Sequence, residues 1–160
     1  MDLIVFQQRG FALFEDAEIE KLIGNLPNLN EWLIDSTGVE YPKDVDLTPA
    51  HEYIKNKYVD PYCKFVSYGY KGVWNKTDAP SLEWHNDLVE GPNLFFMYYL
   101  SDITQGGELM FRVDKKPTGL IQPRKHLLVM ASQESNVEHK VNVTEQTRIV
   151  CNFGFNVQWN

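Results

Sequence analysis

Hydrophobic and polar residues follow two different spacings along the chain, and the spacing changes near Pro61. Before this point, apolar side chains recur every three or four positions in two segments, which is typical of amphipathic helices. We expect the first helix between Asp16 and Leu26, with Asp16 as its cap. The second is expected to begin at Thr48, because a threonine N-cap followed by Pro49 suits the first turn of a helix, and to end before Pro61.

After Pro61, short apolar runs separated by turn residues replace this pattern. Such runs predict β-strands, and eight are expected, over residues 63–70, 82–87, 94–101, 108–113, 119–122, 126–131, 137–143 and 147–157. A helical start followed by these strands predicts an α+β chain that is mainly β. The expected fold is a jelly roll (a double-stranded β-helix) with N-terminal helices packed on one sheet. An up-and-down barrel fits the same spacing.

Composition narrows the class of protein. The chain has 160 residues, of which 43% are hydrophobic and 13% aromatic, enough to fill the core of one domain and to exclude disorder as its main state. Its 22 acidic and 15 basic residues give a net charge of −7, which disfavours nucleic acid as a partner. The longest apolar stretch, Leu94 to Leu100, is far shorter than the ~20 residues that span a bilayer, so no membrane partner is expected. Two cysteines, Cys63 and Cys151, are too few for a disulfide framework and favour a cytoplasmic protein.

Metal chemistry is indicated by a histidine and an aspartate two positions apart. His85 and Asp87 lie in a predicted strand, so their side chains leave the same face and can bind one ion. A third ligand must come from another histidine: His51 lies in the predicted helix, His126 opens an apolar strand, and His139 lies in a late strand, where we expect it opposite the valines. Two histidines and one carboxylate leave three coordination positions open, as in non-haem Fe(II) oxygenases. The alternative is a simple His85–Asp87 pair to which His139 is unrelated.

An arginine in an apolar strand favours the metal interpretation. Arg148 follows His139 and opens the strand that contains Ile149 to Phe153. A guanidinium in such surroundings is costly to desolvate unless an anion binds it. A dicarboxylate cosubstrate could supply that anion through a bidentate contact, and the alternative is an internal salt bridge to Glu108.

The order and spacing of these residues match a known family. The segment from Phe65 to Val157 resembles the 2-oxoglutarate/Fe(II)-dependent dioxygenases, and within them the prolyl 4-hydroxylase-like branch. The residues that carry the resemblance are Tyr68, His85-Asn86-Asp87, Tyr98-Tyr99-Leu100-Ser101-Asp102, Gly106-Gly107-Glu108-Leu109 with Phe111, Val137-Glu138-His139 and Arg148.

The resemblance implies a role for each site residue. It implies that His85, Asp87 and His139 are the catalytic metal ligands and bind Fe(II). Arg148 would bind the distal carboxylate of 2-oxoglutarate, the Tyr99 hydroxyl would be a second donor, and Tyr68 would contact the other end of this cosubstrate. The alternative for each tyrosine is core packing, the role that we expect for Tyr98. Dioxygen is the further cosubstrate, and ascorbate is an optional addition.

The implied protein is a single oxygenase domain over residues 1–160, with 1–62 as helical support and 63–157 as the jelly-roll core. Its expected reaction is hydroxylation of a C–H bond, with a prolyl or other side chain of a peptide or protein as first candidate and with release of succinate and CO2. Hydroxylation of a free amino acid or small metabolite is the alternative, oxidative demethylation of nucleic-acid bases is a weaker third, and a non-catalytic cupin-like metal-binding module belongs to a different class.

Three further expectations concern the surroundings of the site. Residues 71–82 form either a lid or a solvated connection. Arg112 is expected as an exposed arginine at a strand end. Glu138, next to His139, is expected to face the opposite side of its strand and to be solvated.

Overall fold

The computed structural model describes residues 1–75, 83–87 and 91–160. The N-terminal part contains three α-helices, a 3₁₀ turn, a π-helical turn and three strands: α1 (Leu3–Arg9), β1 (Phe11–Glu15), α2 (Glu18–Ile23), η1 (Leu29–Glu31), β2 (Leu33–Ile34), β3 (Glu40–Tyr41), α3 (Thr48–Ile54) and η2 (Lys55–Val59). Longer strands follow: β4 (Cys63–Asn75), β5 (Leu94–Tyr99), β6 (Leu109–Val113), β7 (Lys116–Ile121), β8 (Leu127–Ser132), β9 (Val137–Val141) and β10 (Ile149–Trp159). None of the helices in these residues is long and apolar enough to cross a membrane.

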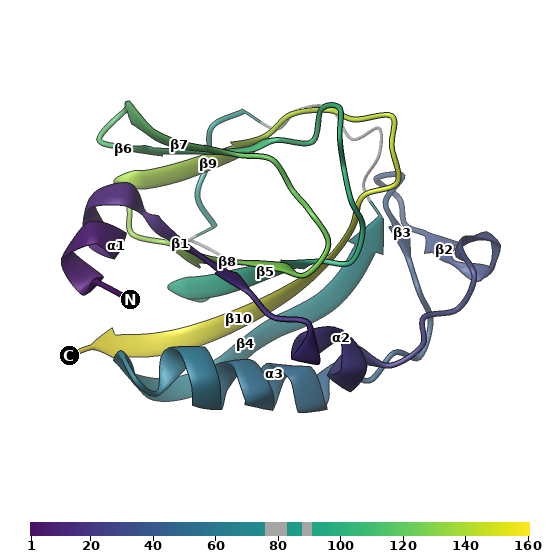
Figure 1. Ribbon diagram of the computed structural model, residues 1–160, viewed down its shortest axis with the longest axis horizontal. Helices are drawn as coiled ribbons and strands as arrows, with labels where there is room; N and C mark the ends of the chain where they lie inside the picture. Colours follow the sequence, from purple (N-terminus) through teal and green to yellow (C-terminus); the bar gives the residue numbers. More distant parts are fainter. Residues whose placement is uncertain (76–82, 88–90) are drawn as a thin grey trace.

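The strands form two antiparallel sheets. The large sheet has seven strands in the order β1-β8-β5-β10-β4-β3-β2, and the small sheet has three in the order β7-β6-β9. The small sheet lies over one face of the large sheet, while α2 and α3 lie along the opposite face (Figure 1). Strands that are neighbours in the sheets are mostly distant in the sequence, so the up-and-down barrel is excluded and the predicted jelly roll with helices on one sheet is confirmed.

The central strands β5 and β8 of the large sheet are buried on both faces, and the protein has two apolar clusters. Along β5, Phe96 and Tyr98 join the cluster beneath the helices, whereas Phe95, Met97 and Tyr99 join the cluster between the sheets. This division follows from the two-residue period of a strand. Tyr98 is therefore a core residue, as predicted, and Tyr99 faces the space between the sheets.

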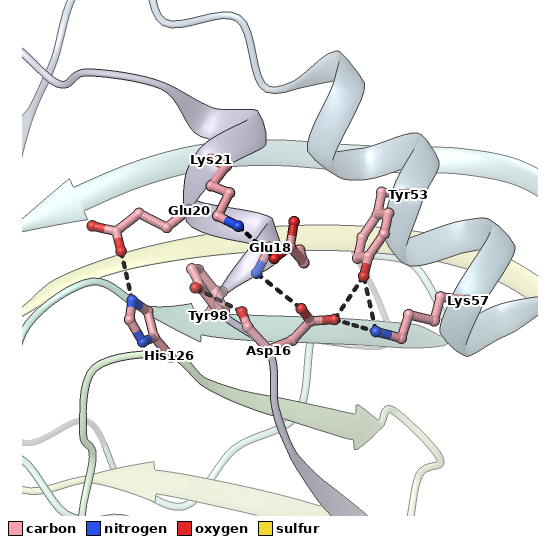
Figure 2. A network of polar contacts seen from close by, with 8 residues as sticks. All are labelled: Asp16, Glu18, Glu20, Lys21, Tyr53, Lys57, Tyr98 and His126. Atoms are coloured by element: carbon pink, nitrogen blue, oxygen red, sulfur yellow. Dashed lines mark hydrogen bonds and ion pairs between the residues drawn. The ribbon is translucent and has the colours of Figure 1, made fainter.

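A buried carboxylate joins the helices that cover the large sheet. Oδ2 of Asp16, a residue that is 5% exposed, accepts hydrogen bonds from Lys57 Nζ and from the hydroxyls of Tyr53 and Tyr58, and Figure 2 shows the first two of these contacts. Oδ1 accepts the Glu18 amide. Burial is the largest influence on the pKa of Asp16 and raises it, but the hydrogen bonds from Lys57, Tyr58, Glu18 and Tyr53 together outweigh burial and lower the pKa below 3.8. The ionised carboxylate thus ties α2 to α3.

The N-terminal part differs from the prediction of purely helical support. Helix α1 and strand β1 were not expected, and β1 pairs with β8 along its whole length. Asp2 caps the amides of Ile4 and Val5, and Gly10 ends the helix with a φ of 82°. Residues 1–62 therefore contribute an edge strand to the jelly roll as well as the helices.

Three further boundaries were wrong. Helix α2 ends at Ile23, because Gly24 closes it before Leu26 is reached. Thr48 is the first helical residue rather than the cap, since Asp46 Oδ1 accepts its amide. The described part of the predicted strand 82–87 forms no strand, and only His85 makes an isolated bridge to β9. Of the proposed lid, residues 71–75 belong to β4, and 76–82 lie outside the described residues.

Candidate metal centre

Two chain segments far apart in the sequence bring three metal-binding side chains together. His139 comes from β9, and His85 and Asp87 come from the segment 83–87 that runs beside it. His85 and His139 exchange both backbone hydrogen bonds, at 3.1 and 2.9 Å, which sets the two imidazoles side by side with ring centres 4.3 Å apart. One ligand atom from each of the three side chains lies within 4.8 Å of the others. This is a group that one divalent ion can join.

The contacts of the His85 and His139 imidazoles orient their ring nitrogens for metal binding. His85 Nδ1 lies 2.7 Å from the carbonyl oxygen of Glu83, which can only accept, so Nδ1 carries the proton and Nε2 keeps its lone pair. His85 Nε2 is 4.0 Å from Asp87 Oδ1, and His139 Nε2 is 3.6 Å from Asp87 Oδ2. Both imidazoles thus point toward the same carboxylate.

His139 is buried, and its Nδ1 has no hydrogen-bond partner within the described residues. Burial, assisted by His85, lowers the pKa of His139 to about 3, so its imidazole is neutral at physiological pH, as a metal ligand must be. The expectation that His139 lies opposite the valines was wrong, because residues two apart in a strand share a face, and Val137 is buried beside it. The nitrogen that faces Asp87 is Nε2, at 3.6 Å from Oδ2, and it is the one that can bind a metal ion.

The acidic ligand lies at the open side of the group. The Asp87 side chain is 41% exposed and that of His85 is 29% exposed, whereas that of His139 is 7% exposed. The Asp87 amide donates to Oε1 of the fully buried Gln133 over 2.8 Å, which holds the backbone at this ligand. Small molecules can therefore reach the group from the side of Asp87 and His85.

Arg148 is buried between the sheets with no anion beside it. It is 4% exposed, Nη2 donates to the Tyr99 hydroxyl over 3.3 Å, and Nε has no hydrogen-bond partner. Within residues 1–75, 83–87 and 91–160, no carboxylate lies at ion-pair distance from the guanidinium. Glu108, the alternative partner, accepts instead from Asn142. The guanidinium and the phenol together form a site for an anion.

The orphaned polar atoms gather in the same region. Four buried side-chain atoms of the described residues have no hydrogen-bond partner: Gln133 Nε2, His139 Nδ1, Arg148 Nε and Asn152 Oδ1. Asn152 shares one face of β10 with Val150, a member of the cluster between the sheets, and Arg148 directly precedes this strand. Because proteins rarely leave such groups unpaired, their concentration here indicates a ligand site.

Tyr68 is not brought to this group. It lies opposite Phe155 of β10, where the register shifts, and its ring packs 4.6 Å from that of His51 on α3. Tyr68 therefore contacts the helix side of the large sheet, which removes the geometric basis for its predicted contact with the cosubstrate. Tyr70, two residues further along β4, is 40% exposed; burial, and after it the charge of Asp87, raise its pKa to about 12. Nothing in the sequence marks the bulge that separates the two.

The remaining histidines serve the fold. His51 Nε2 pairs with the Gly154 carbonyl oxygen at 2.9 Å, and burial lowers the pKa of this ring. His126 pairs with Glu20 of α2 (Figure 2). His139 is thus the histidine that accompanies His85 and Asp87.

Comparison with known proteins bears on the fold. No protein-family model matches the chain, and no curated protein sequence matches it. Among solved structures, a prolyl hydroxylase from Trichoplax adhaerens, in complex with a hypoxia inducible factor oxygen degradation domain peptide fragment, is similar with a TM-score of 0.66, 13% identity and coverage of 96% of this chain and 86% of that chain.

Two bacterial structures give the same result. A Pseudomonas putida prolyl-4-hydroxylase has a TM-score of 0.62 at 12% identity, covering 96% of this chain and 97% of that one. A 2OG-Fe(II) oxygenase family oxidoreductase from Burkholderia pseudomallei has a TM-score of 0.61 at 10% identity, covering 96% and 88%. At these identities the likeness shows that the chain has the fold of these enzymes.

Proposed function

We propose that this protein is an Fe(II)- and 2-oxoglutarate-dependent dioxygenase that hydroxylates a C–H bond. The observation that carries the proposal is the meeting of His85, Asp87 and His139 within 4.8 Å. A buried guanidinium without a carboxylate partner in the described residues supports it, because a metal-binding module alone has no need of Arg148. The shared fold with prolyl hydroxylases supports it further.

The proposed reaction converts one 2-oxoglutarate, one dioxygen and one C–H bond into succinate, CO2 and a C–OH group. One oxygen atom enters succinate and the other enters the product alcohol, so atoms and electrons balance. Fe(II) would supply the activation of dioxygen, which amino-acid side chains cannot perform.

The chain contributes ligands, charge and orientation. His85 Nε2, a ring nitrogen of His139 and the Asp87 carboxylate hold the ion, and a single anionic ligand leaves the filled site with a net positive charge that attracts a dianion. Arg148 binds the distal carboxylate of 2-oxoglutarate, with the Tyr99 hydroxyl as its neighbour. Burial of this pair excludes water from the contact and strengthens it.

The proposed substrate is a side chain of a peptide or protein, with proline as the first candidate. The support is the fold shared with prolyl hydroxylases, one of which is solved with a peptide fragment. The open side of the metal centre, at His85 and Asp87, is accessible to a polymer.

The test is formation of succinate from 2-oxoglutarate by the purified protein with Fe(II) and ascorbate, with and without proline-containing peptides. We expect succinate that disappears in His139→Ala and persists in Arg124→Ala, which removes an exposed arginine paired with Glu15. Stimulation by a peptide, with a mass increase of one oxygen atom in it, supports the peptide substrate, and stimulation by free amino acids alone replaces it with the small-molecule alternative. Absence of succinate under all conditions contradicts the proposed function and favours a non-catalytic module.

A further inference from the structure

The segment that carries two of the three metal ligands has little support from the sheets. Residues 83–87 belong to no strand, and their backbone contacts with the rest of the described chain are the His85–His139 bridge and the bond from Asp87 to Gln133. One ladder pair is weak support for a segment that must present His85 and Asp87 in a fixed geometry. The Asn86 side chain adds a bond from Nδ2 to the Ser135 carbonyl oxygen at 3.4 Å, and a further contact lies on the other side of His85.

Trp84, directly before His85, makes that contact on the outer side of the small sheet. The Arg112 guanidinium carbon lies 4.5 Å from the centre of the Trp84 ring. Arg112 Nε also donates to Glu138 Oε2 over 2.7 Å, and Lys115 Nζ donates to the same carboxylate at 2.9 Å. Arg112 and Glu138 were expected to be exposed and solvated, but their side chains are only 20% and 13% exposed.

The strand pairing explains why this contact can act on the metal ligands. Arg112 of β6 lies directly opposite Glu138 of β9, on the face of the small sheet away from His139. The guanidinium is planar, so it can donate to Glu138 through its edge while its face covers the indole of Trp84. Trp84 and Glu138 adjoin His85 and His139 in the chain. The contact thus joins the two ligand-bearing segments from outside.

We propose that Arg112 is a positioning residue for the metal centre, which clamps Trp84 to Glu138 and so fixes His85 and Asp87 relative to His139. The inference rests on the proposed function in one respect, namely that these three side chains bind the metal ion. In a continuous strand, the ladder of hydrogen bonds would hold His85 and Asp87 in place. Here the Trp84–Arg112–Glu138 clamp on the outer face of the small sheet does so.

The experiment measures Co(II) and Mn(II) binding to the full chain by titration calorimetry, without cosubstrate or turnover. Arg112→Ala and Trp84→Ala are expected to weaken metal binding about 10- to 100-fold, the range typical when groups behind metal ligands are removed. Arg112→Lys keeps the charge and loses the planar stack, so a smaller weakening is expected. Trp84→Phe keeps an aromatic face and is expected to retain most of the affinity.

Two controls separate positioning from general destabilisation. Arg124→Ala removes an exposed arginine–glutamate pair elsewhere and should leave metal affinity unchanged. The visible absorption of bound Co(II), which reports ligand geometry, should change in Arg112→Ala and stay unchanged in Arg124→Ala. Affinity within twofold of the wild type together with an unchanged Co(II) spectrum in Arg112→Ala overturns the inference.

The outcomes distinguish this inference from the proposed function. If the wild type binds metal through His85 and His139 and Arg112→Ala binds it equally well, the clamp is refuted and the proposed function stands. If the wild type binds no divalent metal, both are refuted. If Arg112→Ala fails to fold, Trp84→Ala and Arg112→Lys decide, because each removes part of the clamp, and an affinity within twofold of the wild type in both refutes it.

Discussion

The charged side chain of Arg148 is buried, since only 4% of the residue is exposed to solvent. Leaving a guanidinium there without an anion costs several kcal/mol, which the Tyr99 hydroxyl and the ring face, 5.5 Å from the guanidinium carbon, offset only in part. The neutral imidazole of His139, whose Nδ1 has no hydrogen-bond partner, shows the same pattern. Single residues of this kind support the proposal that a ligand binds here.

Replacement of the arginine tests its role. Arg148→Ala should weaken binding of 2-oxoglutarate to the Mn(II)-loaded protein by about 2–5 kcal/mol, because it removes one partner of a desolvated charge pair. Isothermal titration calorimetry measures this difference, with Arg124→Ala as the surface control. Equal affinity in Arg148→Ala would refute the assigned contact.

A second residue-scale prediction concerns Asp16 and pH. Its pKa is lowered in the folded state, so its contribution to stability is full above the unfolded value of 3.8 and is lost as pH falls through the lower folded value. Asp16→Asn should reduce the free energy of unfolding by about 1–3 kcal/mol at pH 7, since hydrogen bonds to a charged group are lost. Urea unfolding at pH 7 and in the range below pH 4 measures both effects. An equal acid dependence in wild type and variant would contradict this account.

At the scale of elements, strands with continuous apolar runs were predictable and irregular segments were not. The runs that became β5 and β8 are buried on both faces, so composition alone marks them. The bulge in β4 and the loop that carries His85 depend on contacts with distant residues, such as the bond from Asp87 to Gln133. The spacing of His85 and Asp87 indicated a metal pair, and the family resemblance implied His139 as the third ligand; the structure brings the three together although 83–87 is not a strand. Tyr68 was predicted on the wrong face because the local spacing of residues does not reveal the register shift between β4 and β10.

The packing of β7 against β1 gives an element-scale prediction. A Cβ on Gly119 of β7 would lie 2.4 Å from the Phe11 ring, which stacks on Phe111 with ring centres 4.7 Å apart. Gly119→Ala should therefore cost about 1–3 kcal/mol of stability through overpacking. Chemical denaturation measures the loss, and the double variant with Phe11→Leu should recover part of it. Additive losses in the double variant would show that the two residues do not share this space.

At the scale of the whole molecule, the large sheet separates the packed core beneath the helices from the candidate site. Its helix side holds a conventional core fastened by Asp16, and its other side faces the small sheet, where the unpaired polar atoms lie. The jelly-roll fold and the helices that pack on one sheet could be predicted from the sequence. Strand β1 could not be predicted, because a five-residue strand at a sheet edge has no distinctive pattern. The molecule thus combines a stable scaffold with a site whose residues require a ligand.

Metal binding should consequently stabilise the entire fold. Mn(II) at a hundred times its Kd contributes about 2.7 kcal/mol, which corresponds to roughly 5–10 °C in Tm for a chain of this size. Thermal unfolding followed by circular dichroism measures the shift, which should vanish in His139→Ala. A shift of equal size in that variant would place the ion elsewhere.

The most direct measurement is a crystal structure of the protein with Mn(II) and 2-oxoglutarate under anaerobic conditions, with the ion located by anomalous diffraction. The account predicts one strong anomalous peak in contact with His85, Asp87 and His139, and a carboxylate of 2-oxoglutarate on Arg148. An ion bound elsewhere, or a 2-oxoglutarate that does not touch Arg148, would contradict it.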